Sequence, residues 1–566
     1  MTAFGMAREY LSTELWGGVF RTRNWVAIGF GLLAISFGIW GFYACGDTNA
    51  ACKTGSLGDK LFRTIDLIRL STHFTLDHDP WQLVLAQLMM PLALLVGAIR
   101  LFVHNLRRDL RVVRVRGMRG HVIVCGVGDT GRHIAEQLAD AGHKVVAISR
   151  DNKDVNSLAC ERRGIVVLQG DGMESTLLRV AGLKHASSVF IVCGSDAVNI
   201  EIGLRADGAA ASRGSLEPLK IWVELRNDWL YDTILTHRTR VNIGGSAQFR
   251  LFNLNANAAR LLLRSDAFRR AAARAPHAAP HLVAMGQGQT LSEIVVQAAQ
   301  GNFAAPGRRL GVTLLGENAQ AVLGAMMAKY PGLPDCIDIQ AKDCTFDDAG
   351  WAGVAAAVAQ IDPFAVVADL QDEIATMKAG LRLRRSLDLL DRQDLPVFAR
   401  VWQQRKLGDF LHGLERDSPV PDRLTVFGDL ASLTDPAGLL AESIDLLAIS
   451  AHEAYRRSGG ASAIPGWNDL SEQAKQSNRA FADHIAVKLS EVAHDREWDE
   501  DEIEKLARME HWRWSLALKL RGWRHGERDE IRKRHPLLKD WEELDENSRD
   551  MNRQMVRRIP GIVKSV

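Results

Sequence analysis

The chain carries almost no excess charge of either sign. Its 566 residues include 70 basic and 68 acidic side chains, a formal net charge of +2. Such a balance gives no global argument for nucleic-acid binding, which depends on a basic surface, so we expect no nucleic-acid partner. The length exceeds what one hydrophobic core supports, and several folded units are therefore expected.

Recognisable metal and catalytic motifs are also missing. The seven cysteines form no CxxC or zinc spacing, and the histidines form no HExxH pair, so no metal site is expected. No partnered nucleophile or acid–base constellation stands out. We therefore do not expect an enzyme; a membrane oxidoreductase that uses NAD(P) is a remote alternative.

Two long hydrophobic stretches are present near the N-terminus. Residues Trp25 to Ala44 carry no charge over about the length that a helix needs to cross a membrane, and Trp81 to Val103 forms a second stretch. Basic residues precede the first stretch and follow the second, and the positive-inside rule places these two flanks in the cytoplasm. They are Arg21, Arg23, Arg107, Arg108, Arg111, Arg114, Arg116 and Arg119. The sequence thus predicts a two-pass protein of the cell (inner) membrane, with both termini cytoplasmic and the lipid bilayer as a partner.

The cysteines divide between the two expected compartments. Cys45 and Cys52 fall in the loop expected outside, where they either pair as a disulfide or remain free. The other five fall in the cytoplasmic part and are interpreted as core residues.

A pore-loop-like segment, residues 61–80, lies between the two stretches. A short helical piece followed by a Ser-Thr loop resembles the layout of two-span potassium channels that carry cytoplasmic RCK (regulator of potassium conductance) domains. The pore-loop candidates, however, contain no glycine where a potassium filter reads TVGYG: Thr72, His73, Phe74, Thr75 and Asp77. Two interpretations stay open: a plain two-helix anchor, or a modified pore that passes cations with little selectivity.

The most informative motif lies between His121 and Asp151. An apolar strand meets a turn with Gly126, Gly128 and Gly131, then a helix, then a second apolar strand. In a dinucleotide-binding fold, such glycines make the turn, admit a pyrophosphate to the backbone and pack helix on strand. The order of elements predicts a Rossmann-like module, with Asp129 and Thr130 at the same turn as further cofactor-binding candidates.

The end of the second strand departs from the simplest NAD pattern. It reads Ser149, Arg150, Asp151, and an arginine beside a small hydroxyl suits the 2′-phosphate of NADP(H). In the alternative, Arg150 is solvated and Asp151 takes the ribose.

The following residues resemble the RCK, or TrkA-N, family over about a hundred positions. A third strand ends at Gly170 and Asp171, and a fourth precedes Ser195 and Asp196. The resemblance implies a doubly wound sheet that binds NAD(H), NADP(H) or another adenine nucleotide as a regulatory ligand. It implies that Ser149 and Arg150 meet the ribose and that Asp171 with Ser195 or Asp196 lines the base side. Turn-forming or helix-capping roles remain the alternative for Asp171 and Asp196.

A second, degenerate copy of the glycine pattern begins at His281. Gly286 and Gly288 are present, and Thr290 stands where the third small residue belongs. Alternating strand and helix patterns follow, which predicts another parallel sheet. Either this turn binds a ligand or it keeps only its packing role.

The C-terminal part is rich in tryptophan and histidine and contains two segments that echo each other, which suggests a duplication. The pieces Gly522-Trp523, Lys533 to Pro536 and Met551 to Arg553 resemble the RyR domain of ryanodine receptors and of prokaryotic proteins. Flat aromatic faces and guanidinium groups suit a nucleotide, and packing in a helical core is the alternative. The ligand-pocket candidates are Tyr455, Trp467, Arg479, Trp512, Trp514, Trp523 and Arg534.

Together these features predict a two-helix transmembrane region joined to tandem Rossmann-like doubly wound sheets and a mainly α-helical RyR-like domain. The expected domains are a cytoplasmic N-terminus (1–24), a membrane domain (25–105), a basic linker (106–119), a first Rossmann domain (120–275), a second (278–435) and the RyR-like domain (445–566). We expect a ligand-gated, cation-channel-like homo-oligomer, a dimer or tetramer, because one two-span subunit cannot enclose a pore. A non-conducting, membrane-anchored nucleotide sensor is the alternative.

Overall fold

The chain forms two compact units, Met1–Arg114 and Val115–Val566, and each is described by itself. The computed structural model describes residues 25–45, 56–69, 79–151, 153–211, 213, 217–227, 230, 247–274, 280–301, 309–347, 350–402, 424–435, 445–458, 464–470, 472–492 and 496–564.

The N-terminal unit consists of helices. They are α2 (Trp25–Cys45), α3 (Leu57–Asp66), the 3-10 turn η2 (Leu67–Arg69) and α4 (Trp81–Arg116), whose last residues enter the second unit. Ser56 starts α3 with a capping box, because its side chain and that of Asp59 satisfy each other's backbone N–H groups. Gly38 and Gly41 of α2 leave no room for a side chain beside Thr64 and Leu83, so the helices pack closely.

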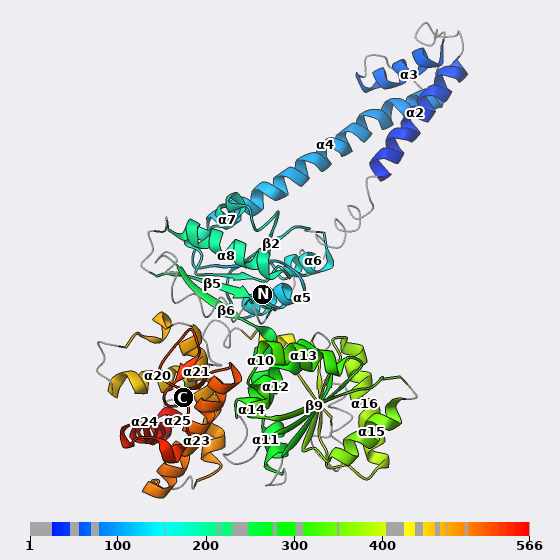
Figure 1. Cartoon of the computed structure of the whole chain (residues 1–566). Helices are drawn as coiled ribbons and strands as arrows, with labels where there is room; N and C mark the ends of the chain where they lie inside the picture. The colour runs from blue at the N-terminus through cyan, green and yellow to red at the C-terminus, as the bar shows by residue number, and fades with distance from the viewer. Residues whose placement is uncertain are drawn as a thin grey trace. The chain divides into compact units, whose positions relative to one another are not determined.

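The two predicted membrane spans coincide with parts of α2 and α4 (Figure 1). Among the described residues, no helix is both long and apolar enough to cross a membrane. Cys45 is disulfide-bonded. Cys52, for which a disulfide with Cys45 and a free thiol both stayed open, lies outside the described residues. All five pore-loop candidates also lie outside them, namely Thr72, His73, Phe74, Thr75 and Asp77.

The first sheet is the predicted doubly wound one. Its six strands lie in the order β3-β2-β1-β4-β5-β6, and every neighbouring pair is parallel. The strands are β1 (Val122–Cys125), β2 (Val145–Ser149), β3 (Val166–Gln169), β4 (Ser188–Ile191), β5 (Leu219–Glu224) and β6 (Ala247–Phe252). The connecting helices are α5 (Asp129–Asp140), α6 (Val155–Arg162), α7 (Ser175–Val180), the 3-10 turn η3 (Leu183–His185) and α8 (Asp196–Ala210). The strand order reverses between β1 and β4, which is where such folds bind ligands.

The second sheet repeats this topology, as the alternating pattern predicted. Its order is β12-β11-β10-β7-β8-β9, again with parallel neighbours throughout. The strands are β7 (His281–Gly286), β8 (Gly311–Gly316), β9 (Asp338–Asp343), β10 (Ala365–Asp369), β11 (Val397–Arg400) and β12 (Leu424–Phe427). The helices are α12 (Gln289–Ala299), α13 (Ala319–Lys329), α14 (Leu333–Cys336), α15 (Gly350–Ile361), α16 (Glu373–Leu389) and α18 (Leu430–Leu433).

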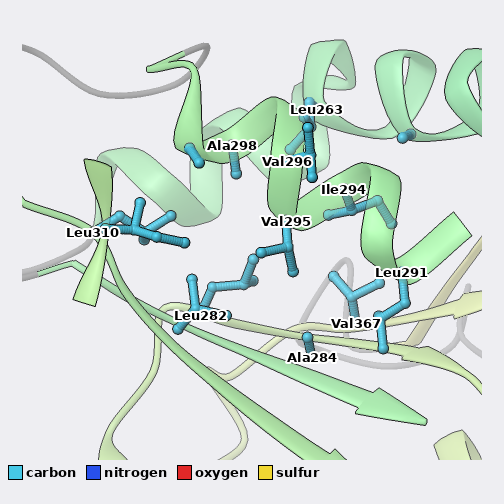
Figure 2. Packing of buried hydrophobic residues seen from close by; sticks show 14 of the residues in the cluster. Leu263, Leu282, Ala284, Leu291, Ile294, Val295, Val296, Ala298, Leu310 and Val367 are labelled. Carbon is cyan, nitrogen blue, oxygen red and sulfur yellow. The ribbon is translucent and has the colours of Figure 1, made fainter. Parts of the chain in front are cut away.

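Helix α10 (Leu254–Arg264) is shared between the two cores. Leu254 and Ala258 are buried in the first core, whereas Leu262 and Leu263 are buried in the second. Figure 2 shows Leu263 beside α12 and β7 in that second core. The next helix, α11 (Asp266–Ala273), also packs into the second core, so residues assigned by sequence to the first domain support both sheets.

The C-terminal module is mainly helical, as predicted. It comprises α20 (Leu446–Ser458), the 3-10 turn η6 (Trp467–Asp469), α21 (Glu472–Asp483), α22 (Ile485–Leu489), α23 (Glu500–Leu520), β13 (Arg524–His525), β14 (Arg534–His535), the 3-10 turn η7 (Trp541–Glu543), α24 (Glu546–Arg557) and α25 (Ile559–Lys564).

The predicted duplication of this module is visible in its histidines and tryptophans. The Nε2 atom of His452 lies 2.9 Å from the backbone carbonyl oxygen two residues before Trp467. The Nε2 atom of His511 lies 2.8 Å from the carbonyl oxygen two residues before Trp541. Both tryptophans are buried, and each histidine ring contacts the tryptophan of its own copy.

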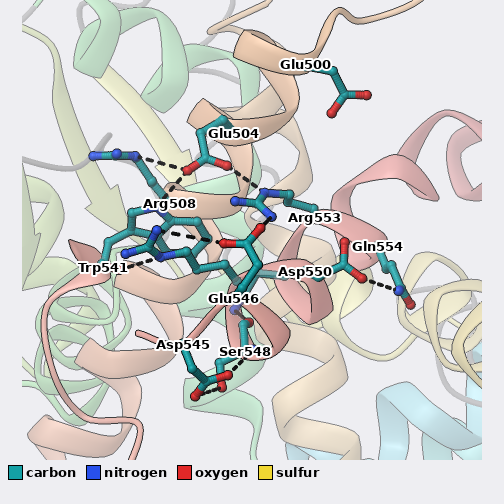
Figure 3. A network of polar contacts seen from close by, with 12 residues as sticks. Glu500, Glu504, Arg508, Trp541, Asp545, Glu546, Ser548, Asp550, Arg553 and Gln554 are labelled. Carbon is teal, nitrogen blue, oxygen red and sulfur yellow. Dashed lines mark hydrogen bonds and ion pairs between the residues drawn. The ribbon is translucent and has the colours of Figure 1, made fainter. Parts of the chain in front are cut away.

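An arginine–acid pair also occurs once in each copy. The Nε atom of Arg479 donates to Asp445 at 2.9 Å, and that of Arg553 donates to Glu504 at 2.7 Å (Figure 3). Each acid precedes its copy's histidine by seven residues, and each arginine follows its copy's tryptophan by twelve. The module is therefore built from two copies of one helical unit, α20 to α21 and α23 to α24.

Candidate functional site

The first glycine turn connects β1 to α5, and its three glycines have different surroundings. Gly126 has φ +94°, and a Cβ there would lie 2.7 Å from the carbonyl oxygen of Val192. A Cβ on Gly131 would lie 1.8 Å from the carbonyl oxygen of Gly126. A Cβ on Gly128 would meet nothing within 4 Å. Thus the fold requires two of the glycines, and the third leaves the turn open to a ligand.

Gly128 is also the N-cap of α5 and has no side-chain cap. The first backbone N–H groups of a helix lack partners within the helix, and they favour an anion. The turn and the helix together therefore form a phosphate-binding geometry.

This turn opens into a cavity of about 880 Å³ at the carboxyl ends of β1, β2, β3 and β4. Seven of the ten predicted cofactor-binding residues line it: Gly126, Gly128, Asp129, Thr130, Ser149, Arg150 and Asp171. Gly131, Ser195 and Asp196 do not. Lining residues that sequence reasoning missed include Asn156, Gly172, Cys193, Arg226 and Trp402. The volume is within the range of pockets that hold a nucleotide-sized ligand.

The charged residues that line the cavity are mostly acidic. Four aspartates line the cavity, namely Asp129, Asp151, Asp154 and Asp171. The two lining arginines are both paired: Arg150 lies 3.2 Å from Asp171, and Arg226 lies 3.2 Å from Glu224. Among the described residues that line the cavity, no cation is thus left unpaired for a 2′-phosphate, whereas carboxylates suit a free 2′-hydroxyl.

Ser149 and Arg150 are placed differently from the expected ribose contacts. The Ser149 hydroxyl donates to the carbonyl oxygen of Asp151 at 2.8 Å. The Arg150 side chain is 68% exposed. This geometry favours the alternative in which Arg150 is solvated and a carboxylate takes the ribose.

Asp196 stabilises the loop after β5. Its carboxylate accepts the backbone N–H groups of Arg226 at 2.9 Å and Asn227 at 2.6 Å. Asn199 completes the link, because its side chain accepts from the Cys193 N–H and donates to the Glu224 carbonyl. The geometry thus favours a turn-forming role for Asp196. It also shows that Asn199 positions the loop, a role that the sequence motif does not indicate.

Glu224 lies behind this loop. Burial raises the pKa of its carboxyl group, and Arg226 opposes that effect. Together with Asn199, it fixes the end of β5 at the edge of the cavity.

The second glycine turn is closed. A Cβ on Gly288 would lie 2.0 Å from the Asp369 carboxylate carbon, and the N–H groups of Gln287 and Gly288 donate to the Asp369 carbonyl oxygen. Asp369 is buried, and its carboxylate lies 3.5 Å from Arg400. A carboxylate therefore lies beside the turn where a phosphate would bind, and this copy keeps only the packing role.

The RyR-like ligand-pocket candidates do not form one pocket. Only Arg479 and Trp514 line a common cavity, of about 240 Å³. Trp467 is buried in a core, and Tyr455 is half exposed. Trp512 packs near Gly301 of the second Rossmann domain, whereas Trp523 contacts His535 beside the exposed Arg534.

Ion pairs already neutralise most arginines of that smaller cavity. Arg260 pairs with Asp445 and Asp483, and Arg479 also pairs with Asp445. Arg513 pairs with Glu510. A phosphate would thus compete with buried carboxylates, and the structure favours a packing role for this charge network.

Within the described residues, no group of three or more metal-ligating side chains is arranged to hold an ion. The cysteine thiols near the first site do not favour a thiolate either, since burial raises the pKa of Cys193 to about 11 and that of Cys125 well above its ordinary value.

Comparison with known proteins assigns two regions. Residues 122–228 match the TrkA-N domain family, and residues 485–563 match the RyR domain family. The RyR match contains the second copy of the repeated helical unit, whereas the first copy, α20 to α21, precedes it.

Similar proteins come from archaea and match over short segments. An uncharacterized protein of Methanothermus fervidus is 30% identical over 113 residues, 20% of this chain and 16% of that protein. Potassium channel protein 1 of Methanocaldococcus jannaschii is 29% identical over 93 residues, 16% of this chain and 28% of that protein. A Trk system potassium uptake protein TrkA homolog of Archaeoglobus fulgidus is 30% identical over 90 residues, 16% of this chain and 20% of that protein. The chain thus spans less than a third of the length of each relative.

Comparison with solved structures finds, among others, GsuK bound to ADP and the GsuK channel bound to NAD. The first is 15% identical, covers 74% of this chain and 96% of its own, and has a TM-score of 0.39. The second is 13% identical, covers 74% of this chain and 83% of its own, and has a TM-score of 0.41. The chain therefore contains one region that matches the TrkA-N domain family, which includes β1 to β5 of the first sheet, and one that matches the RyR domain family.

Proposed function

We propose that the TrkA-N domain is a regulatory nucleotide site. The observation that carries this proposal is the cavity at the switch point between β1 and β4, with Gly128 open beside an uncapped helix N-terminus. The ligand is an adenine nucleotide with a free 2′-hydroxyl, such as NAD(H) or ADP. NADP(H) is disfavoured because both lining arginines are already paired.

The proposed output is a gated cation pathway. Its support is the order of the N-terminal elements, a hydrophobic helix, a short helix and a second long helix, together with the relatives named as potassium-transport proteins. In this proposal the chain is a two-pass membrane protein and a homo-oligomer. Nucleotide binding then favours one packing of the cytoplasmic domains, which acts on α4.

A non-conducting, membrane-anchored nucleotide sensor is the second candidate. It is favoured by the sequence between Thr72 and Asp77, which has no glycine where a potassium filter requires it. The same nucleotide site would then control another output of the oligomer.

Ion flux from liposomes that contain the full-length protein separates the two candidates. NAD(H), ADP and NADP(H) are added in turn, to wild type and to Gly128→Val. A flux that responds to NAD(H) or ADP in wild type and not in the variant supports the gated pathway. Absence of flux, with nucleotide binding intact, rejects the pathway and supports the anchored sensor.

A further inference from the structure

Trp402 belongs to the second Rossmann domain but lines the cavity of the first. It follows β11 by two residues and is half-buried. Its backbone is fixed on both sides, because its N–H donates to the Glu373 carboxylate at 3.0 Å and its carbonyl oxygen accepts the Leu430 N–H at 3.0 Å. The backbone of Trp402 is therefore anchored at the edge of the cavity.

The surroundings of Trp402 join the two domains. Its ring packs against a core that combines Val124 and Ile134 of the first domain with Leu430 and Leu433 of α18. Nearby, the Gln137 side chain of α5 donates to the carbonyl oxygen of Ala431 at 3.0 Å. The same helix α5 presents its N-terminus to the cavity, so α18 and the Trp402 segment support the ligand-binding helix from the second domain.

Arg400 connects the ring to the closed glycine turn. Its guanidinium carbon lies 4.6 Å from the centroid of the Trp402 ring, a cation–π contact. The same guanidinium group lies 3.5 Å from Asp369 and donates to Asn255 of α10 at 2.8 Å. The second domain's own site is therefore filled by groups that also hold Trp402.

We propose that Trp402 is a wall of the nucleotide site that the second Rossmann domain supplies to the first, with its ring stacking on the ligand's aromatic base. Flat indole faces stack well on any base, and the guanidinium group of Arg400 contacts the same ring. Nucleotide binding then depends on docking of the two domains and stabilises that docking in turn. This inference rests on the proposed nucleotide site and names a further ligand-binding residue for it.

The test compares three variants of the full-length protein by calorimetric titration with NAD⁺ and ADP. Trp402→Phe keeps an aromatic face and should bind within about threefold of wild type, whereas Trp402→Leu keeps only apolar volume and should bind about tenfold more weakly. Leu433→Ala is the matched control, because Leu433 is buried in the same inter-domain core but does not line the cavity. It loosens the docking but leaves the cavity wall in place, so it should weaken binding clearly less than Trp402→Leu does.

Three results would overturn the inference, and they differ in what else they reject. Equal affinity of Trp402→Leu and wild type, with Gly128→Val unable to bind, rejects the wall and keeps the nucleotide site. Equal weakening by Trp402→Leu and Leu433→Ala assigns the effect to loosened docking and rejects stacking. Absence of nucleotide binding by folded wild type rejects the wall together with the proposed site.

Discussion

At the residue scale, the space around each glycine separates folding from binding. Gly126 and Gly131 face backbone atoms, whereas Gly128 faces the cavity. A sequence motif alone cannot assign these roles, because the carbonyl oxygen that excludes a side chain at Gly131 is positioned only when helix α5 docks on β1. The motif did indicate which residues form the turn.

Substitution of Gly131 should therefore destabilise the fold. The Cβ atom of Gly131→Ala would lie 1.8 Å from the carbonyl oxygen of Gly126, which is far inside van der Waals contact. The helix α5 must therefore shift. We expect a loss of about 1–3 kcal/mol in the free energy of unfolding, the usual effect of overpacking. Urea unfolding checks this. Gly128→Ala is the control and should change the free energy of unfolding far less; an equal loss in both variants would contradict the assignment.

Selectivity for the ribose should depend on Asp171. Asp171→Asn removes the negative charge that pairs with Arg150. It keeps a side-chain oxygen that can accept the backbone N–H of Met173, as Asp171 does in wild type. Arg150 then becomes available for a 2′-phosphate, and the affinity for NADP(H) relative to NAD(H) should rise by about tenfold, the size of one charge-assisted contact. Competition titrations with the two nucleotides measure the ratio. An unchanged ratio would show that Arg150 does not reach the ribose end.

At the element scale, the strands and the repeated helices were predictable, whereas their pairing across domains was not. Period and turn signals predicted β7 to β12 as a second parallel sheet. The sequence does not indicate a role for Trp402, because this residue directly follows an apolar strand pattern. No local pattern shows that the end of this strand meets another domain. The sequence also does not show that α10 is divided between two cores, because its apolar residues fit the pattern of a single amphipathic helix.

Acid should weaken the C-terminal module through its buried ion pairs. Contacts with Arg513 and Lys488 lower the pKa of Glu510 to about 2 against the opposing effect of burial, and the pKa of Asp445 is also lowered by Arg479 and Arg260. These carboxylates are ionised in the folded state and bind protons more readily when unfolded. Their stabilising contribution is therefore complete above pH 4.5 and is lost as the pH falls toward 2.

Unfolding monitored by circular dichroism between pH 7 and pH 3 tests this dependence. The free energy of unfolding of wild type should fall as the pH drops below 4.5. That of Glu510→Gln should fall less steeply over the same range. At pH 7 the variant should be less stable by about 3–5 kcal/mol, because Arg513 keeps a buried charge without its partner and Lys488, whose pKa burial already lowers to about 8, loses the carboxylate that favours its charged form. A parallel pH dependence in the two proteins would contradict the role of Glu510.

At the scale of the whole molecule, one Rossmann domain has an open site and the other a closed one. Asp369 fills the second turn, and the neighbouring Arg400 and Trp402 reach toward the first site. The tandem arrangement thus concentrates ligand binding in one cavity, and the second domain gains a supporting role. The C-terminal module contacts the same framework, because Arg260 of α10 pairs with Asp445 and Asp483.

These contacts connect the first cavity to every domain of the larger unit. Helix α10 joins the two cores and holds the C-terminal module by buried charges. Thermodynamic linkage is reciprocal. If a ligand stabilises one packing of these domains, then that packing binds the ligand more tightly than the other packing does.

Calorimetric titration of the full-length protein with NAD⁺, for wild type, Gly128→Val and Gly208→Val, tests the central claim most directly. Gly208 is an exposed helix position of the same domain with open space around it, so it controls for the substitution itself. The account predicts saturable binding by wild type and Gly208→Val and no measurable binding by folded Gly128→Val. Equal binding by all three proteins, or by none, would contradict a nucleotide site at the β1–α5 turn.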